Sequence, residues 1–105
     1  MTQGKWQKLS KEEQILNIAS EFSRTKNLLI SKNEKLAMGC LNRAFELIDL
    51  TSNDPRWRKG ALKELLRFRE VLAEFYLKKD KTLEELIKIF KTLLMFNKFS
   101  SLVKI

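Results

Sequence analysis

The chain has 105 residues, which is room for one domain, and 44% of them are hydrophobic, which is enough to form a packed core. It carries 21 Lys and Arg against 13 Asp and Glu, a net charge of +8, with no histidine and one cysteine, Cys40. This composition excludes histidine-based acid–base catalysis, an intrachain disulfide and a Cys/His zinc cluster within one chain.

The residue types favour helices over strands. Leucine occurs 18 times and valine twice, and there are only three glycines and one proline. Strands favour valine, whereas leucine, lysine and glutamate are accepted freely in helices, and a turn-rich β architecture would need more glycine and proline. We therefore expect an all-α fold, an antiparallel up-down four-helix bundle of residues 1–105, with the C-terminal helix or tail shared in a dimer as one further arrangement.

Two helices are expected in the first half of the chain. Residues 1–9 are polar and are expected to be a flexible N-terminus. Ser10 with Glu13 three residues later forms a capping box, which predicts a helix over about 11–30. A second helix is expected over about 34–51, and Cys40 lies in its apolar stripe, where a buried thiol behaves as a small hydrophobe.

Two more helices are expected in the second half. Asn53 or Asp54 can cap a helix over about 55–78, with Pro55 in its first turn and Trp57 at the edge of the core. Thr82 and Glu85 form a second capping box, which predicts a helix over about 83–98. Residues 99–105 follow as an apolar tail.

Cations gather in the first half of the expected helix 55–78. At helical spacing they form a stripe opposite its apolar face, where backbone N–H groups and basic side chains together suit phosphates or acidic partners. This candidate anion or nucleic-acid face consists of Arg56, Arg58, Lys59, Lys63 and Arg67. A solvated face is the favoured alternative, with an acidic protein and a nucleic acid as equal functional options.

One charge falls on an apolar face of the same helix. Arg69 lies between leucines, so it must find a partner, and Glu21, Glu46 and Asp49 are the candidates. The favoured interpretation of Arg69 is a structural buried ion pair that sets helix register; the alternative is a pocket for an anionic ligand.

The C-terminal third has more apolar surface than one bundle seam needs, because its apolar arc spans about 180° instead of about 100°. Self-association is favoured for this surplus, ahead of packing within the chain and of a membrane surface. The candidate association residues are Ile89, Met95, Phe96, Phe99, Leu102 and Val103.

These patterns predict a small non-catalytic helical interaction or oligomerisation module, with a homodimer or another protein as its partner. The alternatives are a nucleic-acid-associated protein that uses the basic face, and then a peripheral membrane protein. No catalytic residue, metal, cofactor or small-molecule substrate is inferred. The lone cysteine and the lack of a signal-like start favour the cytoplasm.

Overall fold

The computed structural model describes residues 1–58 and 60–96. Over these residues the chain is helical and forms no strand, which confirms the all-α class. The helices are, in chain order, α1 (Gln3–Gln7), α2 (Lys11–Ile30), α3 (Glu34–Ser52), the 3-10 helix η1 (Pro55–Trp57), α4 (Leu62–Leu77) and α5 (Leu83–Leu94).

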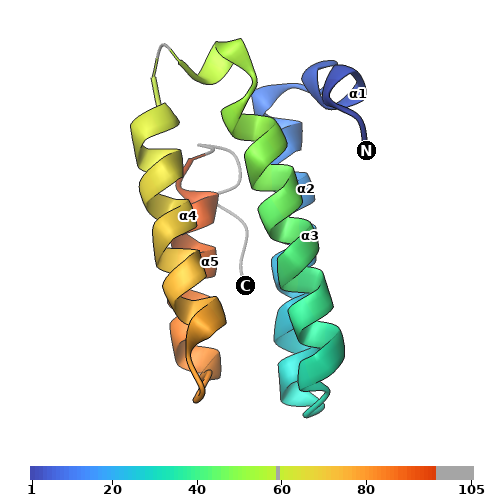
Figure 1. The fold of residues 1–105 in the computed structure, drawn as a ribbon, viewed down its shortest axis with the longest axis vertical. Coiled ribbons are helices and arrows are strands. Elements are labelled where there is room, and N and C mark those ends of the chain that lie inside the picture. Colours follow the sequence, from blue (N-terminus) through green and yellow to red (C-terminus); the bar gives the residue numbers. More distant parts are fainter. Residues whose placement is uncertain (59, 97–105) are drawn as a thin grey trace.

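The four long helices pack together. Helix α2 packs against α3 and α5, and α4 packs against α3 and α5, so each long helix has two neighbours. Figure 1 shows α1 and η1 gathered at one end of the four long helices, which we call the upper end. The α2–α3 and α4–α5 turns lie at the opposite, lower end. None of the helices described is both long and apolar enough to cross a membrane.

Of the two capping boxes that the sequence predicts, one forms completely and the other forms only in part. Ser10 accepts a hydrogen bond from the Glu13 backbone N–H at 3.1 Å while the Glu13 carboxylate accepts one from the Ser10 N–H, so the first capping box is complete. At α5, the Thr82 hydroxyl accepts from the Glu85 N–H, but the Glu85 carboxylate binds Lys78 Nζ and the Thr82 hydroxyl. Helix α5 then ends at Leu94, four residues before the expected end at residue 98.

The expectation of one continuous helix over 55–78 is wrong, because the chain forms η1 and then a separate α4 that begins at Leu62. Trp57 explains the break: its ring is buried and its Nε1 donates to Gln14 Oε1 at 2.8 Å, which sets the direction of η1. Gly60 then disfavours a continuous helix, since glycine costs about 1 kcal/mol relative to alanine in a helix interior.

The N-terminus is not the flexible segment that was expected for residues 1–9. Trp6 on α1 is fully buried, and its Nε1 donates a hydrogen bond to Thr51 Oγ1 at 3.0 Å. Gln3 Nε2 donates to the Leu50 carbonyl oxygen at 2.9 Å. Burial of an indole ring with its N–H satisfied is strongly favourable, so α1 is attached to the end of α3.

The centre of the core is aromatic. The Phe22 ring of α2 lies 5.9 Å from the Phe68 ring of α4 and 5.6 Å from the Phe90 ring of α5, measured between centroids. Cys40 is buried in α3, in keeping with its apolar stripe. Because Phe22 contacts two other helices, this cluster joins α2, α4 and α5.

Candidate interaction site

An apolar groove of about 620 Å³ lies between α4 and α5. On each side of the groove the lining residues recur at spacings of three, four and seven, so they share one face of a helix. Each of these two faces forms one wall of the groove. We call this the α4–α5 groove; it is lined by Ala61, Glu64, Arg67, Phe68 and Val71 on the α4 side and by Lys88, Ile89, Thr92, Met95 and Phe96 on the α5 side.

The floor and upper end of the groove are held by aromatic packing. The Phe96 ring stands edge-on to the Phe68 ring with centroids 6.0 Å apart, and edge-on to the Trp57 ring at 6.3 Å. Ile89 lies in the floor and is 8% exposed. These contacts preform the groove, because its aromatic residues also pack against the core.

Val71 and Met95 are the large apolar side chains of the groove that are most exposed to solvent. Val71 is 49% exposed and Met95 is 77% exposed. Exposed apolar residues that lie singly are ordinary on a protein surface, but these two share one concave, mainly apolar surface. Such a surface is typical of a site that another apolar group covers.

The sequence-predicted association residues divide into two groups. Ile89, Met95 and Phe96 line the α4–α5 groove. Phe99, Leu102 and Val103 lie outside the described residues. The opposite wall contains Phe68 and the exposed Val71, and neither is among the association residues that the sequence predicts.

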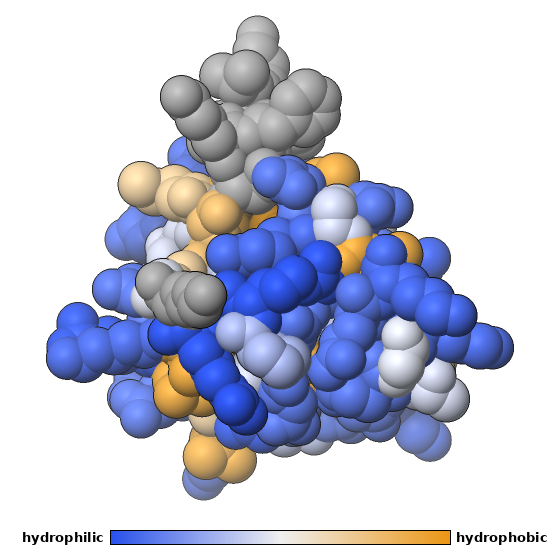
Figure 2. Space-filling model, turned by 90° about the horizontal axis from the view of Figure 1, so that it is seen from above, coloured by the Kyte–Doolittle hydropathy of each residue, from blue (hydrophilic) through white to orange (hydrophobic). Residues whose placement is uncertain are grey.

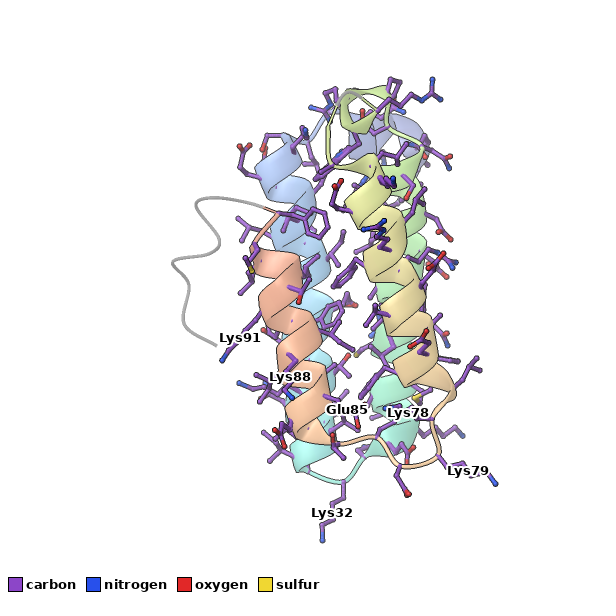
Figure 3. All side chains as sticks on the ribbon, turned by 90° about the vertical axis from the view of Figure 1, so that its left-hand side faces the viewer. Lys32, Lys78, Lys79, Glu85, Lys88 and Lys91 are labelled. Carbon is purple, nitrogen blue, oxygen red and sulfur yellow. The ribbon has the colours of Figure 1, made fainter. Side chains whose placement is uncertain are left out.

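Charges of both signs surround the groove. Glu64 and Arg67 lie on the α4 side, and Lys88 on the α5 side has its Nζ 3.8 Å from a Glu84 carboxylate oxygen. Figure 3 looks onto α4 and α5 and shows Lys88 and Lys91 on α5, with Lys78 and Glu85 close together near the lower end. The groove therefore has a polar edge that can fix the orientation of a bound apolar segment.

The predicted basic face is divided by the break between η1 and α4. Arg56 is bound to the chain segment before α2: its Nη2 donates to the carbonyl oxygens of Gln7 and Leu9, at 3.0 and 2.6 Å, and to Asp54 Oδ2 at 2.6 Å. The expectation that Arg56 shares one helical stripe with Lys63 and Arg67 is wrong, because Arg56 belongs to η1 and they belong to α4.

The other residues of that predicted face have different surroundings. Arg58 and Lys63 are exposed, and within residues 1–58 and 60–96 neither forms a salt bridge. Arg67 lines the α4–α5 groove. Lys59 lies outside the described residues.

A buried polar cluster holds Arg56 in place. Gln14 is completely buried, and its Nε2 donates to the Trp6 carbonyl oxygen at 3.0 Å and to Asp54 Oδ2 at 2.9 Å. Asp54 is also buried, and its hydrogen bond from the Arg56 guanidinium, helped by the bond from Gln14, lowers the pKa of its carboxyl to about 2. This cluster joins α1, α2 and η1 and was not expected from the sequence.

The fold adds two lysines to the upper end. Lys8 stands between the two residues whose carbonyl oxygens bind Arg56, and Lys11 Nζ lies 4.5 Å from the centroid of the Trp57 ring. We call Lys8, Lys11, Arg56, Arg58 and Lys63 the basic end. Figure 2, which looks down on this end of the molecule, shows a largely hydrophilic surface.

Arg69 pairs with one of its three expected partners. Its Nε lies 2.7 Å from Asp49 Oδ1, and its guanidinium lies 5.1 Å from the centroid of the Phe45 ring. The hydrogen bond to Asp49 raises the pKa of Arg69. The side chain is 39% exposed, so the pair joins α3 to α4 but is not the buried ion pair that the sequence predicted.

In the described part of the chain, no group of three or more Asp, Glu or Cys side chains could hold a metal ion. No family model matches the chain, and comparisons with curated proteins and with solved structures also give no match. On geometry and charge, we take the α4–α5 groove and the basic end as candidate sites.

Proposed function

We propose that the four long helices form an antiparallel up-down bundle and that the protein is a small, non-catalytic module that self-associates through the α4–α5 groove. The observation that carries this proposal is a concave apolar surface with Val71 and Met95 exposed in it. A cytoplasmic location belongs to the proposal, because a lone buried cysteine fits a reducing compartment.

The free energy gained by burying the two exposed side chains is too small for a stable dimer, so the interface has to be more extended. Full burial of an exposed apolar side chain of this size contributes about 1.5–3 kcal/mol. Association costs about 4–15 kcal/mol in lost translational and rotational freedom. The surface around Val71 and Met95 therefore has to be joined by further apolar groups in a stable complex.

Lysine substitutions in the groove test self-association. We expect the unaltered chain to sediment as a monomer at low concentration and as a dimer at high micromolar concentration. Val71→Lys or Met95→Lys removes apolar burial and introduces a charge, so each should weaken the dimer by about tenfold or more. Sedimentation velocity over a concentration series measures this.

Leu77→Lys is the matched control, because Leu77 is 79% exposed at the end of α4 and does not line the groove. This variant should dimerise like the unaltered chain. A chain that stays monomeric at every concentration, or a control that weakens the dimer equally, would contradict the proposal.

A second candidate function is binding to the phosphates of a nucleic acid at the basic end. The specific observation in its favour is that the bonds of Arg56 to Gln7 and Leu9 bring Lys8 close to η1, which Arg58 follows directly. Trp57 is 1% exposed, so its ring is not available to stack on a base. Recognition would therefore rest on phosphates and be independent of base sequence.

Charge reversal tests this second function. The double variant Arg58→Glu/Lys63→Glu should bind a single-stranded or double-stranded oligonucleotide about tenfold more weakly at low salt, and the slope of affinity against salt concentration should fall by about two. Fluorescence anisotropy measures both quantities. The control is Lys32→Glu/Lys79→Glu, whose lysines point away from the molecule at the lower end (Figure 3). No binding by the unaltered chain at low salt would reject this function.

A further inference from the structure

Two charges of opposite sign lie three residues apart on the α4 wall of the groove. Glu64 and Arg67 both line the groove, and both are exposed. Within residues 1–58 and 60–96 neither side chain forms a salt bridge, although this spacing allows a pair along a helix. The groove therefore presents one carboxylate and one guanidinium to whatever molecule binds there.

The side chains of the segment 97–105 cannot pair with both of these charges. The segment contains Lys98 and Lys104 but no Asp or Glu. A lysine can pair with Glu64, but it repels Arg67. A surface that satisfies both charges has to present an acid to Arg67 and a base to Glu64, and the α4 wall of a second copy carries both.

The residues that line the groove keep their spacing when the direction of the helices is reversed. On α5, Ile89 and Met95 lie three positions on either side of Thr92. On α4, Ala61 and Val71 lie five positions on either side of position 66. A second groove turned end for end therefore presents side chains at matching positions, as a two-fold contact between identical surfaces requires.

The two centres of this pattern lie at about the same height. Ala61, directly before α4, and Phe96, just after α5, both line the groove, and the start of α4 and the end of α5 lie at the upper end (Figure 1). Position 66 is about 7.5 Å below Ala61 and Thr92 is about 6 Å below Phe96 at the helical rise. One axis can therefore pass close to both centres.

A two-fold axis can relate two such grooves in two ways. If the axis runs along the groove, α4 faces the partner's α5, and Arg67 meets the side that carries Lys88 and Lys91 (Figure 3). If the axis runs across the groove, each helix faces its own counterpart in the opposite direction, and Glu64 lies opposite the partner's Arg67. The first arrangement brings cations together, whereas the second pairs opposite charges twice.

We propose that two copies pack groove against groove about an axis that runs across the groove, so that Glu64 of each copy pairs with the partner's Arg67. This inference rests on the proposed function and adds to it the orientation of the two copies and the residues that fix it. Each copy gives one acid and one base to the interface, so the surface is complementary to itself.

The same arrangement covers the exposed apolar side chains of the groove. Met95 lies opposite the partner's Ile89, and Val71 lies opposite the partner's Ala61, because the members of each pair are equally far from the axis. These contacts form twice, once on each side of the axis. The second copy thus supplies the further apolar groups that Val71 and Met95 need for a stable interface.

Charge reversal tests the inference. Glu64→Arg brings guanidinium groups together across the interface and Arg67→Glu brings carboxylates together, so each should weaken the dimer by about tenfold or more. An equimolar mixture of the two variants should dimerise like the unaltered chain, because each contact then joins an Arg to a Glu. The double variant Glu64→Arg/Arg67→Glu should also dimerise on its own. Sedimentation velocity at equal total chain concentration measures all four samples.

Glu74→Arg and Lys79→Glu are the matched controls. They change the net charge by the same amounts, and both residues are exposed and do not line the groove. Each should dimerise like the unaltered chain, and their mixture should dimerise no more tightly than either variant alone.

The outcomes separate this inference from the function on which it rests. A tighter dimer of Arg67→Glu would place Arg67 opposite the partner's α5 lysines and overturn the inference, and so would a mixture no tighter than its two components. If the reversals leave unchanged a dimer that Val71→Lys weakens, the groove is the interface and the orientation is wrong. If the unaltered chain never dimerises, both are wrong.

Discussion

Gln14→Leu should lower the free energy of unfolding by about 2 kcal/mol. The Gln14 side chain satisfies the Trp57 indole N–H, the Trp6 carbonyl and one oxygen of Asp54, all inside the protein. Leucine fills a similar volume but leaves the buried Trp57 indole N–H without this partner, and such a group costs about 1–3 kcal/mol. The Trp6 carbonyl oxygen keeps its bond from the Leu9 backbone N–H. Asp54 keeps its bonds from Arg56, so its carboxylate adds little to the loss.

Urea unfolding followed by tryptophan fluorescence measures this change, because both indole rings of the chain lie in the affected region. Gln7→Leu is the matched control: it makes the same substitution at an exposed position of α1 and should change stability by less than about 0.5 kcal/mol. Equal midpoints for Gln14→Leu and the unaltered chain would show that the cluster does not hold the upper end together.

Phe22→Ala should have a larger effect, a loss of about 4 kcal/mol. The Phe22 ring is completely buried and contacts the rings of Phe68 and Phe90. Its removal loses the transfer energy of a benzyl group and leaves a cavity that three rigid helices cannot close, and such truncations typically cost 3–5 kcal/mol.

The matched comparison is Phe45→Ala. Phe45 also packs edge-on against another ring, that of Tyr76, with centroids 5.6 Å apart, but it is only partly buried. Water can fill the space left by Phe45, so its loss should cost clearly less than that of Phe22. Thermal unfolding followed by circular dichroism measures both variants. If both variants lose the same free energy of unfolding, the centre of the core does not lie at Phe22.

Helix content and two of the long helices could be predicted well from the sequence, because their signals are local. The capping box at Ser10 and Glu13 and the polar turn before Glu34 depend on residues a few positions apart, so α2 and α3 begin where the pattern predicts. The apolar stripes of these helices depend on the helical repeat alone.

The upper end could not be predicted in the same way, because long-range contacts decide it. Nothing local to Trp6 indicates that its indole meets Thr51, 45 residues away, and nothing local to Trp57 indicates Gln14 as its partner, 43 residues away. These contacts override the helix signals around Pro55 and turn a predicted flexible segment into α1. They also explain why Arg56 binds the buried Asp54 and does not belong to a helical stripe.

The candidate groove illustrates the same division. Its α5 wall was predicted, because the apolar arc of that helix is wider than one seam requires. Its α4 wall was not, since Val71 is exposed on a face that becomes part of a groove only where α5 lies beside it.

The sequence alone determined the class of this protein and the faces that its helices bury, because helical periodicity and capping act over one or two turns. The tertiary structure decided which cations remain exposed, which polar groups are buried and where an apolar surface remains open. Those outcomes depend on contacts between residues far apart in the chain, whose free energies exceed the local preferences of the residues that make them.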